Sequence, residues 1–251
     1  LVSVLATDPR IARIDQGGAE AVLKEIAQIP KEERKGIDNL VKGHAYFELK
    51  SYRLAVRAYG QAIEQDTYDD RAVDNLFEAL TFRKPFDAVE VLGNWPDADI
   101  EARLLDALSA DDWQLRHHAL EVLGAREVAT DAHREKVAIV DVNKGTACKT
   151  RKRAVENLAE IAVSEAALEV LREAASHPKI NYCMVDELKG AIAAVEKRRA
   201  KAAAKPDDPA ARELAFEFEL PLELGSNEIN VIARDMDGVE ARYDIAIYRE
   251  K

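Results

Sequence analysis

The sequence predicts a mainly α fold, an α-solenoid of helical repeats followed by a small C-terminal antiparallel β-module. The segment that begins at Trp113 recurs at Cys148, 35 residues later, with Arg, Ala, Glu and Leu in register. Up to residue 204, apolar residues recur with the period of an amphipathic helix, and after residue 205 they alternate with the period of a strand. A repeat of this length indicates helix pairs that bury their apolar faces by stacking.

The helical segments end at prolines, at turns or after polar runs. We expect helices at Ala19–Ile29, Lys31–Leu49, Ser51–Gln65, Asp69–Phe82, Phe86–Leu92, Asp99–Leu108, Asp112–Leu123, Asp131–Val142, Thr146–Ala162, Ser164–Ala175 and Tyr182–Lys201. Ser164 has the side chain of a good N-cap and an acid directly after it. Leu1–Thr7 is a short apolar start.

The stretch Lys201–Pro209 changes composition, since two prolines and two aspartates end helical structure there. The expected organisation is helical repeats of one type at 1–97, of a second type at 98–204, a linker at 205–212 and a β-module at 213–251. We expect three strands in this module, joined by turns at Gly225–Asn227 and Asp237–Gly238. The strands are expected at Leu214–Leu224, Glu228–Met236 and Glu240–Tyr248.

Residues 36–69 resemble a tetratricopeptide repeat. The small and aromatic residues of that motif stand at their usual spacings, as Gly43, Tyr46, Ala55, Tyr59 and Ala62. The usual Trp and Pro positions hold other residues, Asn39 and Thr67. The resemblance implies two closely packed antiparallel helices, and residues 70–101 keep the length of a second unit without its signature.

The segment Asp111–Gly124 resembles a short bacterial HEAT-like repeat. The matching residues are Asp111, Trp113, Leu115, Arg116, Ala119, Leu123 and Gly124, and the second copy keeps Arg151, Ala154 and Leu158. A third copy at Cys183 is weaker, because Asp186 replaces the arginine. The resemblance implies that Arg116 and Arg151 pair with acids or backbone of neighbouring helices as a structural ladder.

The tail resembles the closing strands of bacterial immunoglobulin-like or cadherin-like modules. The residues that carry the resemblance are Pro221, Leu222, Gly225, Asn227, Ile229, Val231, Ala233, Asp235 and Gly238. Such endings occur on bacterial envelope proteins, including processing proteases, so the resemblance implies a location in the bacterial periplasm or cell envelope. Only the closing half of such a module is expected, so its remaining strands would come from another segment or chain.

Composition and charge restrict the class of function. Hydrophobic residues make up 47% and charged residues 33% of the chain, which suits a globular protein with a well-solvated surface. The net charge of −11 opposes nucleic acid as a partner, in spite of the basic run Lys149–Arg153. No apolar run is long enough to insert into a membrane.

No residue pattern indicates an enzyme, a metal or a cofactor. The adjacent His117 and His118 point about 100° apart on a helix, and no zinc-type spacing of His and Cys exists. Cys148 and Cys183 occupy equivalent repeat positions; we expect two buried thiols, with a disulfide possible if the helices shift.

The predicted function is a non-enzymatic scaffold or adaptor that binds a partner protein and forms part of a larger complex. The candidate protein-binding groove is the inner face of the first repeat helix, with Ile37, Leu40, His44 and Phe47. It would take an apolar peptide or helix, unless the preceding helix Ala19–Ile29 already covers it; the β-module could instead add a partner strand. The alternative function is an accessory or regulatory part of a bacterial cell-envelope enzyme, such as a processing protease.

Overall fold

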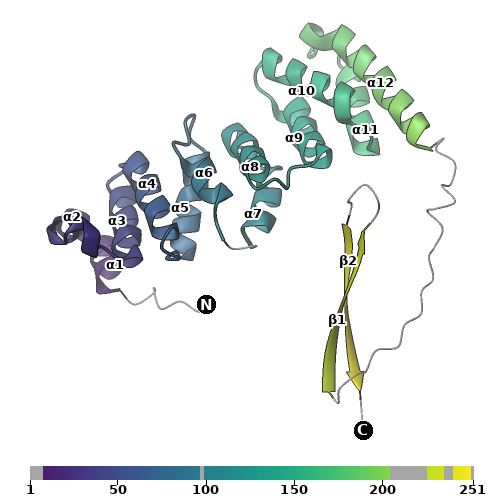
Figure 1. The fold of residues 1–251 in the computed structure, drawn as a ribbon. Coiled ribbons are helices and arrows are strands. Elements are labelled where there is room, and N and C mark those ends of the chain that lie inside the picture. Colours follow the sequence, from purple (N-terminus) through teal and green to yellow (C-terminus); the bar gives the residue numbers. More distant parts are fainter. Residues whose placement is uncertain (1–7, 97–98, 204–224, 235–239, 250–251) are drawn as a thin grey trace. The chain divides into compact units, whose positions relative to one another are not determined.

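The computed structural model describes residues 8–96, 99–203, 225–234 and 240–249. The chain divides into two compact units, Leu1–Ala204 and Lys205–Lys251. The described part of the first unit is mainly helical, and that of the second is a pair of strands (Figure 1). Within the described residues, no helix combines the length and the apolar character needed to cross a membrane.

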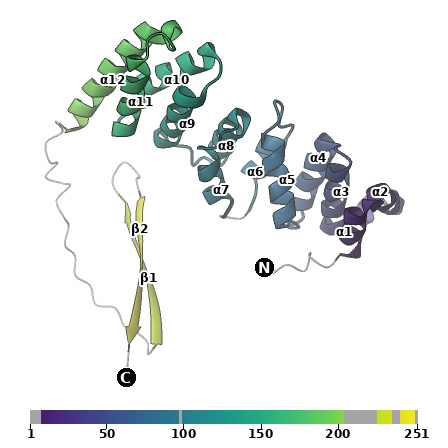
Figure 2. The ribbon, with the colours of Figure 1, turned by 180° about the vertical axis from the view of Figure 1, so that it is seen from behind.

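The first unit is an array of helices in which chain neighbours pack together, as a helical solenoid requires (Figures 1 and 2). Its elements are α1 (Pro9–Arg13), η2 (Ile14–Gly18), α2 (Ala19–Gln28), η3 (Lys31–Glu33), α3 (Gly36–Glu48), α4 (Tyr52–Ile63), α5 (Asp70–Leu80), α6 (Ala88–Gly93), α7 (Asp99–Ala107), α8 (Trp113–Ala125), α9 (Asp131–Lys144), α10 (Cys148–Ile161), α11 (Glu165–Ser176), η4 (Tyr182–Met184) and α12 (Val185–Ala203).

Several helices begin at a side chain that caps their first free backbone N–H groups. Asp69 accepts from the Ala72 N–H at 2.8 Å, which starts α5. The Ser164 hydroxyl accepts from the Ala167 N–H at 3.1 Å, which starts α11 and confirms the predicted N-cap. Each such bond satisfies one donor that the helix itself leaves unpaired.

The predicted helix Lys31–Leu49 is wrong in its first turn. The chain forms the single turn η3, passes through extended backbone at Arg34 and Lys35, and only then enters α3. Asp38 fixes the new start, because its carboxylate accepts from the Lys35 N–H at 2.9 Å. The short elements before Ala19 were not predicted either.

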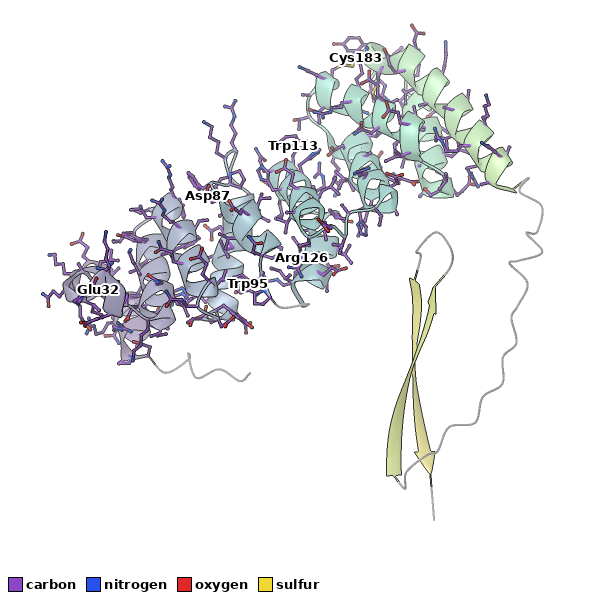
Figure 3. All side chains as sticks on the ribbon, in the orientation of Figure 1. Glu32, Asp87, Trp95, Trp113, Arg126 and Cys183 are labelled. Carbon is purple, nitrogen blue, oxygen red and sulfur yellow. A yellow bond between two sulfur atoms is a disulfide. The ribbon has the colours of Figure 1, made fainter. Side chains whose placement is uncertain are left out.

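One continuous core crosses the predicted repeat boundary at residues 97 and 98. This cluster runs from Leu40 to Val137, and Trp95, with 3% of its surface exposed, belongs to it. Arg126, after α8, donates from Nη1 to the Trp95 carbonyl at 2.7 Å and so ties the turn after α6 to α8 (Figure 3). A second cluster, from Ala138 to Val195, begins on the same helix, α9.

The described part of the second unit is a hairpin. Strands β1 (Gly225–Arg234) and β2 (Glu240–Arg249) pair antiparallel, with Asn230 opposite Asp244. The turn expected at 225–227 is wrong, because these residues are paired with the end of β2. The strand expected at 214–224 lies outside the described residues, so the three-stranded module stays a prediction.

Candidate functional site

The four residues of the predicted groove share one face of α3, but the protein's own core covers half of them. Leu40 and His44 have no exposed surface, and Ile37 and Phe47 are half-buried against the same core cluster. The predicted covering helix, now α2, packs instead mainly on Val41 and Ala45. The face of the predicted groove therefore holds α3 within the array and presents no open groove in this structure.

His44 takes part in a buried polar network that joins α3, α4 and α5. Its Nε2 lies 3.0 Å from a carboxylate oxygen of Asp69, and its Nδ1 lies 3.0 Å from the Tyr59 hydroxyl. The Asn75 amide donates to the same hydroxyl at 2.6 Å. With the His44 proton on Nε2, the ring donates to Asp69 and accepts from Tyr59, so each of these polar groups has a partner. The network is therefore a structural connection.

The ionisation of this network follows from its surroundings. Burial raises the pKa of the Tyr59 phenol, so Tyr59 stays protonated and able to donate. Burial also acts to raise the pKa of Asp69, but hydrogen bonds from His44 and the Ala72 N–H, with the charge of Arg71, bring that pKa below its ordinary value. Asp69 is therefore ionised at neutral pH and accepts both hydrogen bonds.

The open hollow of this region lies beside η3, on another part of α3 and α4 (Figure 3 labels Glu32 in η3). We call it the basic pocket, and its volume is about 450 Å³. Its lining residues are Lys31, Arg34, Asn39, Lys42, Tyr46, Leu54, Arg57, Ala58, Gln61, Glu64 and Gln65. None of the four predicted groove residues lines it.

Four cations line the basic pocket, and none of them forms an ion pair within the described residues. Burial lowers the pKa of Lys42, and the nearby charges of Arg34, Lys31 and Arg57 lower it further. Arg34 is held in place by a hydrogen bond from its Nε to the Ile29 carbonyl, at 3.1 Å. The pocket therefore concentrates positive charge on a chain whose net charge is −11.

A second, smaller hollow adjoins the basic pocket. We call it the apolar pocket: it has a volume of about 150 Å³ and is lined by Leu23, Ile26 and Ala27 of α2 together with Arg34, Lys42 and Tyr46. The last three residues line both hollows. Lys42 Nζ lies 5.8 Å from the centre of the Tyr46 ring. Positive charge and apolar surface thus meet at one place.

The repeated arginines occupy the structural ladder that the sequence predicts. Arg116, with 1% of its surface exposed, donates to the backbone carbonyls of Ala110 and Asp111 and pairs with Asp141 on α9. Arg151 Nε donates to the Val142 carbonyl at 2.8 Å. His117 lies 2.6 Å from the other oxygen of Asp141, so this carboxylate binds two neighbours.

The two cysteines form a disulfide, so the expected pair of buried thiols is wrong. Cys148 is exposed at the start of α10, and Cys183 is half-buried in η4 (Figure 3 labels Cys183). Their Cα atoms are 6.4 Å apart, within the usual range for a disulfide. Cys183 lies in the turn η4, through which the chain enters α12.

Side chains for other chemistry are sparse in the described ranges. There, no three His, Cys, Asp or Glu residues gather closely enough to hold a metal ion. A third hollow, of about 430 Å³, lies beside Trp113, Lys144 and Thr150. The Lys144 ammonium there is already paired with Asp111, unlike the cations of the basic pocket.

The fold and the site together define a mainly α, helical repeat-like array with a basic pocket at its first closely packed helix pair. No protein family, no curated protein and no solved structure matches the chain.

The sequence analysis did not predict the basic pocket, although the groove that it predicted lies on α3, one of the helices that line this pocket. Lys42 and Tyr46 are four residues apart on α3, and this spacing places them on one face. That spacing, together with Arg57 on the next helix, could have predicted a basic surface on this face of α3. The sequence does not specify which face of α3 the following helices cover, and this coverage separates the buried groove from the open pocket.

Proposed function

We propose that this protein is a non-enzymatic scaffold or adaptor that binds a partner protein. The observation that carries the proposal is the basic pocket, an open hollow with polar and charged walls beside the closely packed helices α3 and α4. Stacked helices supply large surfaces for partners and hold them in fixed positions. The absence of a recognisable catalytic pattern in the sequence agrees with a binding role.

We propose further that α3 and α4 form a tetratricopeptide-like unit and that α8 to α12 form HEAT-like units. The close approach of Gly43 to Tyr59 supports the first assignment, because a Cβ at residue 43 would overlap the tyrosine ring. The buried Arg116 and its pairing with Asp141 support the second. An immunoglobulin-like module at the C-terminus belongs to the same proposal, and the hairpin β1–β2 would be its closing part.

Two surfaces are candidates for the partner. The first is the basic pocket with the adjoining apolar pocket, which takes the place of the groove at Ile37, Leu40, His44 and Phe47. The second is the edge of the hairpin, where an extended segment could add a strand through main-chain hydrogen bonds. The two surfaces belong to different units and can be tested separately.

The disulfide supports a second candidate function, an accessory or regulatory part of a bacterial cell-envelope enzyme such as a processing protease. Disulfides persist in oxidising compartments, among them the bacterial periplasm. This candidate shares the binding role and differs in the identity of the partner.

Site-specific photo-crosslinking in cells tests the proposal. A photoreactive amino acid replaces Gln61 in the basic pocket or, as a matched exposed position, Glu121 on α8. We expect one abundant protein adduct from Gln61 and none from Glu121, and an adduct with a catalytic polypeptide would select the second candidate. A folded, expressed protein that gives no protein adduct from either position, or from positions on the hairpin, contradicts the scaffold function.

A further inference from the structure

The basic pocket and the apolar pocket lie side by side and share Arg34, Lys42 and Tyr46. We infer that together they bind an acidic peptide segment of a partner, in which carboxylate side chains flank one apolar residue. The carboxylates occupy the basic pocket and the apolar side chain occupies the apolar pocket. This inference rests on the proposed function and names the chemistry of the partner.

Charge gives the first argument. Lys31, Arg34, Lys42 and Arg57 face one hollow without an ion-paired acid among the described residues, so their mutual repulsion is not offset within the protein. Glu64 is the one acid that lines the pocket, and it is exposed. Carboxylates placed among these cations would form charge-assisted hydrogen bonds, and arginine can bind a carboxylate with two of them.

Side-chain amides favour a peptide over a small inorganic anion. Asn39, with 6% of its surface exposed, lines the basic pocket. The main chain of a peptide can both donate a hydrogen bond to a side-chain amide and accept one from it, whereas an inorganic anion such as phosphate mainly accepts. Gln61 and Gln65 place further amides along the same hollow, whose volume of about 450 Å³ suits several side chains.

The apolar pocket sets the position of the apolar residue. An open hollow of about 150 Å³ has room for a group of about the size of benzene, and half of its lining residues are aliphatic. Here Leu23, Ile26 and Ala27 supply the aliphatic wall, and Tyr46 supplies an aromatic wall next to the cations. A leucine next to glutamates would therefore bind with both kinds of contact, whereas an acidic segment without it would keep only the charges.

Fluorescence anisotropy with the whole chain and three labelled peptides of equal length tests the inference. The first peptide alternates glutamate with leucine, the second replaces each glutamate with glutamine, and the third replaces each leucine with serine. We expect the first to bind at least tenfold more tightly than either of the others, and its affinity to fall as salt is added, because exposed charges are screened. Equal binding of all three peptides would overturn the inference.

A pair of variants locates the peptide. The double substitution Lys42→Gln and Arg57→Gln removes two charges from the basic pocket, and the control Lys24→Gln and Arg53→Gln removes two charges from exposed positions on α2 and α4 that do not line it. We expect the pocket variant to lose tenfold or more in affinity and the control to stay within twofold. Unchanged thermal unfolding of both variants shows that each is folded.

The outcomes also separate this inference from the proposed function. If the cell crosslinks persist while the acidic peptide does not bind, or binds equally to the pocket variant and the control, the scaffold function stands and the inference fails. If inorganic phosphate, at the same concentration as the peptide, displaces the peptide completely, the pocket is assigned to small anions instead. Preferential binding of an unrelated oligonucleotide overturns the choice of a peptide.

Discussion

At the scale of single residues, two aspartates, the half-buried Asp69 and the buried Asp141, hold neighbouring helices together. Asp69 caps α5 and accepts from His44 of α3, and Asp141 of α9 binds Arg116 and His117 of α8. A buried charge is tolerated only when partners replace the water that it loses. Removing one partner of such a pair therefore destabilises the protein by more than the intact pair stabilises it, because the remaining charge stays in place without a partner.

The substitution Asp141→Ala should destabilise the protein by about 3–5 kcal/mol, because it leaves the buried Arg116 without its counter-charge. Asp131→Ala is the matched control, since it removes an exposed carboxylate paired with Arg134 on the same helix and should cost about 1 kcal/mol or less. Urea unfolding followed by circular dichroism measures both changes. Equal midpoints for the two variants would contradict the structural role of Asp141.

The stability should decrease in acid through the same two carboxylates. Burial acts to raise the pKa of Asp141, but the hydrogen bonds from His117 and Arg116 bring it below its ordinary value, and the pKa of Asp69 is lowered as well. A folded-state pKa below the unfolded one contributes stability that is present above about pH 5 and is lost as pH falls through the folded-state pKa. Urea midpoints between pH 7 and pH 3 follow this loss.

The comparison of the native protein with Asp141→Asn isolates one carboxylate. The difference in unfolding free energy between the two proteins should be largest near pH 7 and shrink as the pH is lowered, because protonation makes the native side chain neutral too. A difference that is constant over this range would mean that the charge of Asp141 does not contribute.

At the scale of elements, close helix contacts depend on small residues. A Cβ at Gly43 of α3 would overlap the Tyr59 ring of α4, and a Cβ at Gly36 would overlap the Thr67 side chain. These two glycines let α3 approach α4 and the turn after it. Gly190, inside α12, has open space where its Cβ would lie.

The two alanine substitutions should therefore have opposite signs. Gly43→Ala should destabilise the protein by about 1–3 kcal/mol or more, because the core has no room for the methyl group. Gly190→Ala should stabilise it by roughly 1 kcal/mol, since alanine loses less backbone entropy than glycine in a helix and contacts nothing. Thermal unfolding of both variants measures the signs, and a neutral Gly43→Ala would contradict the close packing.

The disulfide joins the start of α10 to the turn before α12. Because it closes a loop over a sequence separation of 35, its removal by Cys148→Ser should cost about 3–4 kcal/mol. A reducing agent should lower the unfolding temperature of the native protein to that of the variant and leave the variant unchanged. A melting temperature that reduction does not move would contradict the contribution of this bond.

The sequence allowed most helices to be predicted, because their apolar periodicity is strong and prolines or caps such as Ser164 mark their ends. It failed at Lys31–Leu49, where the hydrogen bond from the Lys35 N–H to the Asp38 carboxylate and the close contact of Gly36 set a later helix start. It failed for Cys148 and Cys183 because their separation depends on the local turn η4. The groove predicted on α3 did not include the burial of His44, because that burial depends on its contact with Asp69 at the start of α5, 25 residues later in the sequence.

At the scale of the molecule, the two large core clusters of the helical unit meet on one helix. Val137 of α9 belongs to the first cluster and Ala138 to the second. Repeat arrays unfold cooperatively only while the contacts between neighbouring elements are strong. The helix α9, with its ion pair to α8, is therefore the place where the two halves of this unit are coupled.

Two spectroscopic signals test this coupling. Trp95 belongs to the first cluster, and the half-exposed Trp113 begins α8, whose buried residues belong to the same cluster. Tryptophan fluorescence therefore reports on the part of the unit that holds the first cluster, whereas circular dichroism reports on all helices. In the native protein we expect coincident urea transitions for both signals. In Asp141→Ala the fluorescence and dichroism midpoints should separate, and coincident midpoints in that variant would place the coupling elsewhere.

The disulfide also determines how the chain carries mechanical load. If the two ends of the chain are pulled apart, tension reaches Cys148 and leaves through Cys183 across the covalent bond, so the segment between them bears no force. Helix α11 and most of α10 are inside that segment. They bear no tension while the rest of the helical unit is extended. Only after the disulfide is reduced can these helices unfold under force and add their length to the extended chain.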